Sequence, residues 1–159
     1  MRRTDREITS ATEIAAILDK SPILRLAMCD NNKPYVVPLN YAYELIGGVF
    51  TLYFHGAREG RKADILSRNS AVCFEADCSF EIREGAQACN WSAAYESVIG
   101  EGICELIAAP AEKARAMDLL MRRYGFEGKP EYPPAMLERT AVWRITAESV
   151  SGKSSRKSQ

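Results

Sequence analysis

The segment 34–54 is the most apolar part of the chain, and it limits the fold more than any other feature. It is long enough to suggest a membrane span, but it is interrupted by Pro38, Asn40, Glu44, Gly47 and Gly48. These residues divide it into two pieces of strand length, each too short to cross a membrane as a helix. The segment therefore predicts an antiparallel hairpin, with one strand over residues 35–43 and the next over 49–55.

Helices are expected at three places. Ser10 and Glu13 form a capping box before a helix with one apolar stripe of Ile14, Ile17 and Leu18, and Ser21-Pro22 ends it. Two more helices are predicted over residues 57–69, with Ala63, Ile65 and Leu66 inward, and 110–124, with a stripe of Ala114, Met117, Met121 and Tyr124.

Strand patterns fill most of the remaining chain. Pro38 cannot donate to a ladder, so the strand at 35–43 is expected to have an edge or a bulge there. Gly100 and Gly102 suit a bent barrel strand. Further strands are predicted over residues 23–29, 71–76, 80–83, 95–108 and 141–147. Hairpin-linked strands with inserted helices predict a mainly β fold, an antiparallel β-barrel with α-helices.

Composition narrows the class of protein. Lys plus Arg (21) equals Asp plus Glu (21), so no overall field favours nucleic acid or an anionic membrane. No apolar stretch follows the first arginines, so no secretory signal is expected. Five cysteines without a Cys-x-x-Cys pair, and a single histidine, argue against a metal site and favour reduced thiols in the cytoplasm. We expect one domain over residues 1–150 and a polar basic tail at 151–159.

The densest group of functional side chains lies at residues 53–62. A strand is expected to end at His55, Gly56 and Gly60 free the backbone, and a helix follows. Helix amino termini offer unpaired N–H groups to an anion such as phosphate. Arg58, Arg61 and Lys62 are spaced to share one side of that helix, although such a run is also typical of a solvated basic face.

Other candidates have equally simple alternatives. His55 has room to face a ligand beside Gly56, but a histidine at a strand end is often a packing residue. The strand around Pro38 and Asn40 can support a flat ring system or be plain barrel core. The cluster of Trp91, Ser92, Tyr95 and Ser97 can line a site, an interface or a packed loop.

These motifs, taken in order, resemble the pyridoxamine-phosphate-oxidase-like split-barrel flavoproteins, and most of all their Nim-like branch, named for 5-nitroimidazole resistance. The matching segments are Arg2-Arg3-Thr4-Asp5-Arg6-Glu7, Val37-Pro38-Leu39-Asn40-Tyr41, His55-Gly56-Ala57 with Gly60-Arg61-Lys62, Tyr95-Glu96-Ser97-Val98-Ile99-Gly100-Glu101-Gly102 and Ser151-Gly152-Lys153. The resemblance covers nearly the whole chain. It implies an antiparallel split barrel of Greek-key type that binds FMN.

The resemblance also implies a homodimer with each flavin site shared between subunits. It places residues 37–41 against the flavin ring and His55 near it, and it puts the Lys62 region and the hydroxyls near Ser97 around the phosphate. The cofactor-binding set is then Val37, Pro38, Leu39, Asn40, Tyr41, His55, Gly56, Ala57, Gly60, Arg61, Lys62, Tyr95 and Ser97, with His55 as the catalytic residue.

The expected function is an FMN-dependent reductase of small oxidised substrates, including nitroaromatics, with NAD(P)H as a candidate electron donor. The alternatives are a non-catalytic flavin module and a haem-handling protein with His55 as ligand. The arginine- and proline-rich carboxy-terminal segment of true pyridoxamine phosphate oxidases is replaced here by Trp143-Arg144-Ile145 and Ser151-Gly152-Lys153. Vitamin B6 oxidation is therefore expected to be absent or trace.

Overall fold

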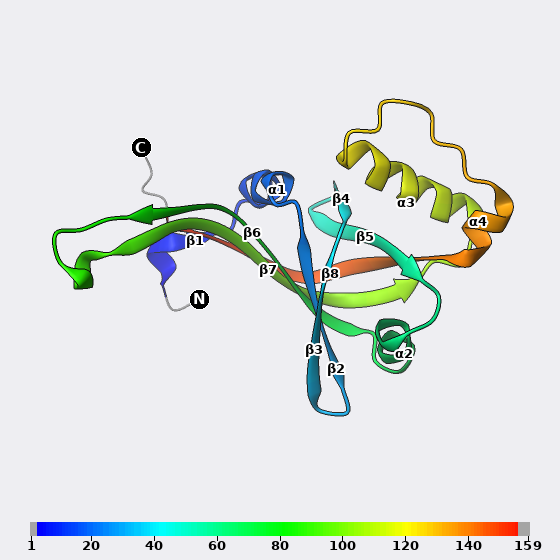
Figure 1. The fold of residues 1–159 in the computed structure, drawn as a ribbon, viewed down its shortest axis with the longest axis horizontal. Helices are drawn as coiled ribbons and strands as arrows, with labels where there is room; N and C mark the ends of the chain where they lie inside the picture. The colour runs from blue at the N-terminus through cyan, green and yellow to red at the C-terminus, as the bar shows by residue number, and fades with distance from the viewer. Residues whose placement is uncertain (1–2, 156–159) are drawn as a thin grey trace.

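A computed structural model describes residues 3–155 of the chain. Figure 1 shows a curved sheet with helices on its outside and a long hairpin projecting from one end. The elements are η1 (Thr4–Arg6), β1 (Glu7–Ile8), α1 (Ala11–Lys20), β2 (Leu24–Asp30), β3 (Lys33–Leu39), β4 (Ala42–Ile46), β5 (Val49–Ala57), α2 (Arg61–Arg68), β6 (Ala71–Arg83), η2 (Ala88–Asn90), β7 (Ser92–Leu106), α3 (Pro110–Arg123), α4 (Pro134–Arg139) and β8 (Thr140–Ser154).

All strand pairs in the described chain are antiparallel, in the order β3-β2-β6-β7-β8-β5-β4, and β1 pairs with β8. β3 and β4 stand at opposite ends of this order, yet only Asn40 and Tyr41 separate them in the chain. The sheet must therefore curl until its two edges approach each other. The mainly β, antiparallel split-barrel fold predicted from the sequence is confirmed.

Two-residue turns fix the register of the outer hairpins. Asn31 and Asn32 have φ of 50° and 63°, and Gly47 and Gly48 have φ of 60° and 84°. Positive φ at both turn residues gives the twist that antiparallel strands need, and asparagine and glycine adopt it at least cost. The Gly47-Gly48 turn joins the two strands of the hairpin that the sequence predicts.

The first helix also begins and ends as predicted. The Ser10 hydroxyl accepts a hydrogen bond from the Glu13 N–H at 3.5 Å, and Ile14, Ile17 and Leu18 are buried. α1 packs against β6, β7 and β8, where its stripe joins the main core, which includes Leu24, Leu26, Tyr41, Leu52, Phe54, Phe74, Val98 and Ile145. A smaller core of Tyr53, Ile107, Ala116 and Val142 lies under α3.

The predicted strand over residues 35–43 is instead two strands. β3 ends at Leu39 and β4 begins at Ala42. Between them the N–H of Tyr41 donates to the Tyr124 hydroxyl at 3.1 Å instead of to a ladder partner. Pro38 lies on β3, an edge strand, which confirms the edge position inferred from its missing N–H.

The two helices after β5 also differ in detail from the sequence prediction. α2 begins at Arg61, because β5 continues to Ala57 and Gly60 has a φ of 114° that a helix does not allow. The buried face of α3 is Lys113, Ala116 and Leu120, one position away from the predicted stripe. Lys113 occupies an inward position because its ammonium donates to the Leu137 and Thr140 carbonyls at 3.3 and 3.2 Å.

The carboxy-terminal strands are longer than predicted. β6 joins the two segments predicted at 71–76 and 80–83, with an irregularity between Cys78 and Glu81. β8 continues past the boundary placed at 150, because Ser151 to Ser154 pair with β7. The remaining tail residues, 156–159, lie outside the described part. α4 has no counterpart in the sequence prediction. Within residues 3–155 no helix is long and apolar enough to span a membrane.

Candidate functional site

The turn between β5 and α2 presents unpaired backbone donors. Gly60 is the residue before the helix, and no side chain in residues 3–155 caps α2 there. The first N–H to bond within the helix is that of Asp64, which donates to the Gly60 carbonyl at 3.0 Å. The N–H groups of Arg61, Lys62 and Ala63 are therefore available to an anion.

Lys62 places a positive charge beside these donors. Its Nζ lies 4.9 Å from the centre of the Phe54 ring and 4.8 Å from that of Trp143, and the two rings stack 5.2 Å apart. No carboxylate among the described residues forms an ion pair with it. Burial lowers the pKa of Lys62, because a desolvated ammonium lacks the water that stabilises its charge. An anion bound beside Lys62 would stabilise the ammonium charge in place of the missing water, so the site is suited to an anion.

Gly56 makes room for that ammonium. A Cβ at this position would lie 2.9 Å from Lys62 Nζ and 3.7 Å from a carbon of the Trp143 ring. The missing side chain therefore allows the lysine to lie across the end of β5.

Arg61 connects this end of α2 to β3. Its guanidinium carbon lies 4.2 Å from the centre of the Tyr35 ring. The structure thus brings the 55–62 segment close to the edge strand that carries Val37, Pro38 and Leu39. Arg58 does not share a helix side with Arg61 and Lys62, contrary to the sequence prediction. It lies before the helix and donates to the Glu138 carbonyl at 2.8 Å, which holds α4.

His55 and Asn40 lie at one end of the same ladder. Ala42 faces Tyr53 in the β4–β5 pair, and Asn40 and His55 are each two residues beyond that pair. Both side chains are exposed. Partial desolvation, and then the Lys62 charge, lower the pKa of His55, so its imidazole is largely neutral at pH 7.

Tyr41, predicted to contact the cofactor, has its side chain in the core. The ring is fully buried, and its hydroxyl lies 2.8 Å from the Leu18 carbonyl and 3.1 Å from that of Ser21. The neighbouring β3 residues are more accessible. Val37 and Leu39 are half-buried, Pro38 between them is exposed, and Val36 before them is 53% exposed.

Tyr95 and Ser97 lie in a different region of the sheet. Ser97 faces Lys153 of β8, whereas Leu106, nine residues further along β7, faces Trp143. At ~3.3 Å per residue, Ser97 is about 30 Å along the strand from the Trp143 end. Within one chain the predicted cofactor residues therefore lie in two separate groups, one around α2 and one around Tyr95.

Lys153 is a member of the second group that the sequence prediction missed. Its Nζ lies 5.4 Å from the centre of the Tyr95 ring. A hydrogen bond from Lys153 lowers the pKa of the Tyr95 hydroxyl. The motif Ser151-Gly152-Lys153 was visible in the sequence, but only the β7–β8 register shows that Lys153 faces Ser97.

The antiparallel sheet curled between β3 and β4, with helices outside it, defines a split-barrel protein. Comparison of the sequence with family models agrees: residues 10–154 match the model described as pyridoxamine 5'-phosphate oxidase. The chain belongs to this family.

Solved structures share the fold. A protein named for 5-nitroimidazole antibiotic resistance, from Bacteroides thetaiotaomicron VPI-5482, is 30% identical, with a TM-score of 0.82 over 93% of this chain and 86% of that one. The flavocytochrome Anf3 from Azotobacter vinelandii is 23% identical, with a TM-score of 0.84 over 99% and 72%. An FAD-binding protein from Mesorhizobium loti is 25% identical, with a TM-score of 0.66 over 95% and 98%. A search of curated proteins finds no match.

Proposed function

We propose that the chain is a cytoplasmic flavoprotein that binds FMN and reduces small oxidised molecules, nitroaromatic compounds among them. The observation that carries the proposal is the half-buried Lys62 ammonium beside the free N–H groups of α2, since together they suit a dianionic phosphate. Family membership supports a flavin, as do the names of the Azotobacter and Mesorhizobium structures. The name of the Bacteroides protein supports nitroaromatic substrates.

In this proposal, different residues near the α2 end bind different parts of the cofactor. The α2 N–H groups, Lys62 and Arg61 would hold the phosphate, while the exposed edge at Val36 and Pro38 supports the ring system and Asn40 reaches its polar edge. A bound flavin supplies hydride and single-electron transfer. The neutral imidazole of His55 can orient a substrate at the same end by donating a hydrogen bond, whereas proton donation requires its imidazolium form, which the lowered pKa makes scarcer at pH 7.

The proposal includes a homodimer in which Tyr95 and Ser97 of one subunit approach the α2 end of the other. It is supported by the distance between the two groups within one chain, and by exposed apolar side chains on the β6–β7 hairpin. Phe80 is 69% exposed, Ile82 50% and Trp91 53%. Surfaces of this kind usually mark association sites. Light scattering at micromolar concentration should give a dimer, and a stable monomer would contradict the shared site.

Cofactor identity and phosphate site are tested together. The purified protein should release FMN, identified by its two visible bands and its mass. A Soret band would favour the haem alternative. Release of FAD would show that the bound flavin is FAD and not FMN. Lys62→Glu should weaken FMN binding by about 2–4 kcal/mol, ~30- to 1,000-fold in Kd, while riboflavin, without a phosphate, should be affected far less. Unchanged FMN affinity would place the phosphate elsewhere.

A suitable control for Lys62→Glu is Lys129→Glu, because Lys129 is exposed and lies on the loop after α3. Lys153→Glu is not a neutral control, since Lys153 contacts Tyr95 in the second group. Reaction type is tested by adding NAD(P)H: bleaching of the flavin, followed by turnover on a nitroaromatic acceptor, is expected of the enzyme. A flavin module would show neither, and robust oxidation of pyridoxamine phosphate would contradict the proposed specificity.

A further inference from the structure

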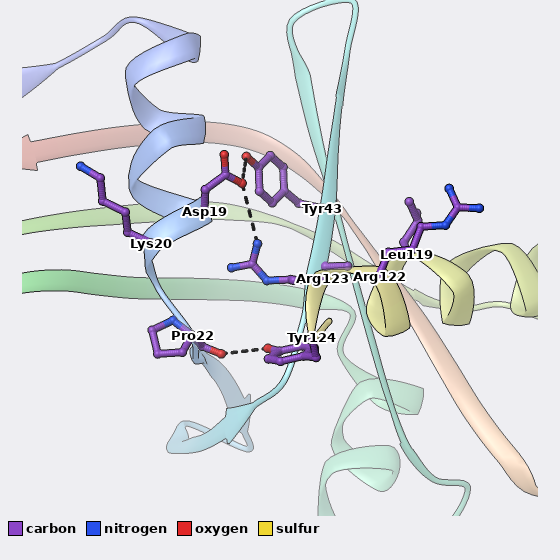
Figure 2. Close-up of a pocket in the computed structure, with 9 residues that line it drawn as sticks. Asp19, Lys20, Pro22, Tyr43, Leu119, Arg122, Arg123 and Tyr124 are labelled. Atoms are coloured by element: carbon purple, nitrogen blue, oxygen red, sulfur yellow. Dashed lines mark hydrogen bonds and ion pairs between the residues drawn. The ribbon is translucent and has the colours of Figure 1, made fainter. Parts of the chain in front are cut away.

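A cleft of about 640 Å³ lies where the carboxy-terminal ends of α1 and α3 meet the beginning of β4 (Figure 2). None of the predicted cofactor residues lines it. Its walls are Asp19, Lys20, Pro22, Ala42, Tyr43, Leu119, Arg122, Arg123 and Tyr124. A volume of this size is typical of small-molecule sites, which measure ~300–1,000 Å³.

The cleft has a surplus of positive charge. Three cations, Lys20, Arg122 and Arg123, line it together with a single carboxylate, Asp19. Lys20 has a partner in Glu96 at 3.3 Å. Arg122 is exposed, and its side chain makes no ion pair or hydrogen bond with a residue that the structure describes. The cleft is therefore lined by two arginines and one lysine, and of these three the Arg122 side chain is the one without a partner among the described residues.

Arg123 is held rigidly in the centre of this group. Its Nη2 donates to the carbonyls of Leu18 and Ser21 at 2.6 and 2.7 Å, and its guanidinium lies 4.3 Å from the centre of the Tyr41 ring. These bonds cap the end of α1, but they use only one of its three nitrogens. Nη1 is 3.8 Å from Asp19, beyond hydrogen-bond distance, and Nε is buried with no partner in the described chain. Nη1 is therefore the nitrogen of Arg123 that is left for an acceptor in the cleft, because the buried Nε has no surface that a ligand could reach.

The aromatic walls are fixed as well. The Tyr43 hydroxyl lies 2.7 Å from Asp19 Oδ1, and the Tyr124 hydroxyl donates to the Pro22 carbonyl at 2.8 Å (Figure 2). Because the polar ends of both rings are already bonded, what they add to the cleft is mainly apolar surface, extended by Leu119. Rigid aromatic walls on either side of a fixed guanidinium favour a ligand that has both an anionic group and a flat apolar body.

We infer that this cleft is a second ligand site, separate from the proposed flavin site, for a small aromatic carboxylate or phosphate. The anionic group is bound by Nη1 of Arg123, Arg122 and Lys20 add positive charge at the edges of the cleft, and the ring lies against Tyr43, Tyr124 and Leu119. Asp19 keeps its bond to Tyr43 and disfavours ligands that carry two anionic groups at the same end.

The test is a titration of the full chain with benzoate and phenyl phosphate, followed by amide chemical shifts in NMR. Both probes should bind and shift the amides around Tyr43 and Arg122. Benzyl alcohol, which has the ring without the charge, and inorganic phosphate, which has the charge without the ring, should bind at least tenfold more weakly. Equal binding of benzyl alcohol, no saturable binding of either aromatic anion, or shifts confined to residues 56–62 would each overturn the inference.

Variants separate this cleft from the α2 end. Arg122→Glu should weaken phenyl phosphate binding at least tenfold, and because Arg122 is exposed the protein should fold normally. The matched control is Arg139→Glu, which reverses an exposed arginine in the last turn of α4 and should leave the affinity unchanged. Lys62→Glu should also leave it unchanged. An Arg122→Glu protein that binds like the wild type, or a loss of binding in Lys62→Glu, would refute the second site.

Discussion

Gly100 should be one of the positions least tolerant of a single added methyl group. A Cβ on Gly100 would lie 2.8 Å from Cε1 of Phe74, with the ring's Cζ nearer still. The Phe74 ring is fully buried in the main core, so it has no solvent to move into. The backbone of Gly100 is not in the left-handed region, so alanine is allowed there and the cost is steric alone.

The expected cost of Gly100→Ala follows from this geometry. Overpacking a core costs about 1–3 kcal/mol, and the lower entropy of the unfolded alanine chain offsets about 0.4–1 kcal/mol of it. A net loss of about 1–2 kcal/mol corresponds to a Tm lower by about 2–8 °C for a chain of this size. Urea denaturation and thermal melting of the variant measure both quantities.

A double-mutant cycle tests whether Phe74 is the cause. Phe74→Leu removes the ring atoms that the new methyl group meets, so it should cost less in the Gly100→Ala background than in the wild type. The two changes should couple by at least about 1 kcal/mol. Additive effects, or a Gly100→Ala protein as stable as the wild type, would refute the reasoning.

Three further outcomes follow from the structure. Because the pKa of His55 is lowered in the folded protein, the unfolded chain binds more protons below its own pKa of ~6.5, so stability is lost as pH falls through that range. His55→Gln should lose less stability than the wild type between pH 7 and pH 5 in urea melts, and parallel curves would contradict this. Tyr41→Phe should lower the free energy of unfolding by about 1 kcal/mol in chemical denaturation, since the buried Tyr41 hydroxyl bonds to the Leu18 carbonyl at the end of α1. An unchanged free energy of unfolding would show that the bond from Arg123 to the same carbonyl is enough. Native labelling with iodoacetamide should modify the exposed Cys29 and Cys89 and spare Cys104, whose pKa burial raises to about 12; prompt alkylation of Cys104 by mass spectrometry would contradict its burial.

Local chemistry made much of the fold predictable. Turns such as Asn31-Asn32 and Gly47-Gly48 depend only on backbone conformations that those residues favour, so their positions follow from the sequence. The face that α3 buries does not. Lys113 points inward because two carbonyls near α4 accept its protons, and α4 itself was not predicted.

The sequence proposes residues for the candidate site, but their arrangement depends on the fold. The basic 58–62 segment is visible in the sequence, whereas the Phe54–Trp143 pair under Lys62 depends on the β5–β8 register. Tyr41 is adjacent in sequence to Asn40, yet its ring lies in the core while the Asn40 side chain is exposed. Adjacent side chains of an extended segment point to opposite sides, so residues of one motif need not face the same site.

The position of β8 has a consequence for how the chain folds. It is the last strand in chain order, yet it lies between β7 and β5 and also pairs with β1 near the amino end. During synthesis β5 and β7 therefore leave the ribosome with their inner edges unpaired, and they wait for a partner that is made later. Contacts so distant in sequence slow folding, and open strand edges invite pairing between chains. Folding yield should therefore depend more on the arrival of β8 than on any step before it.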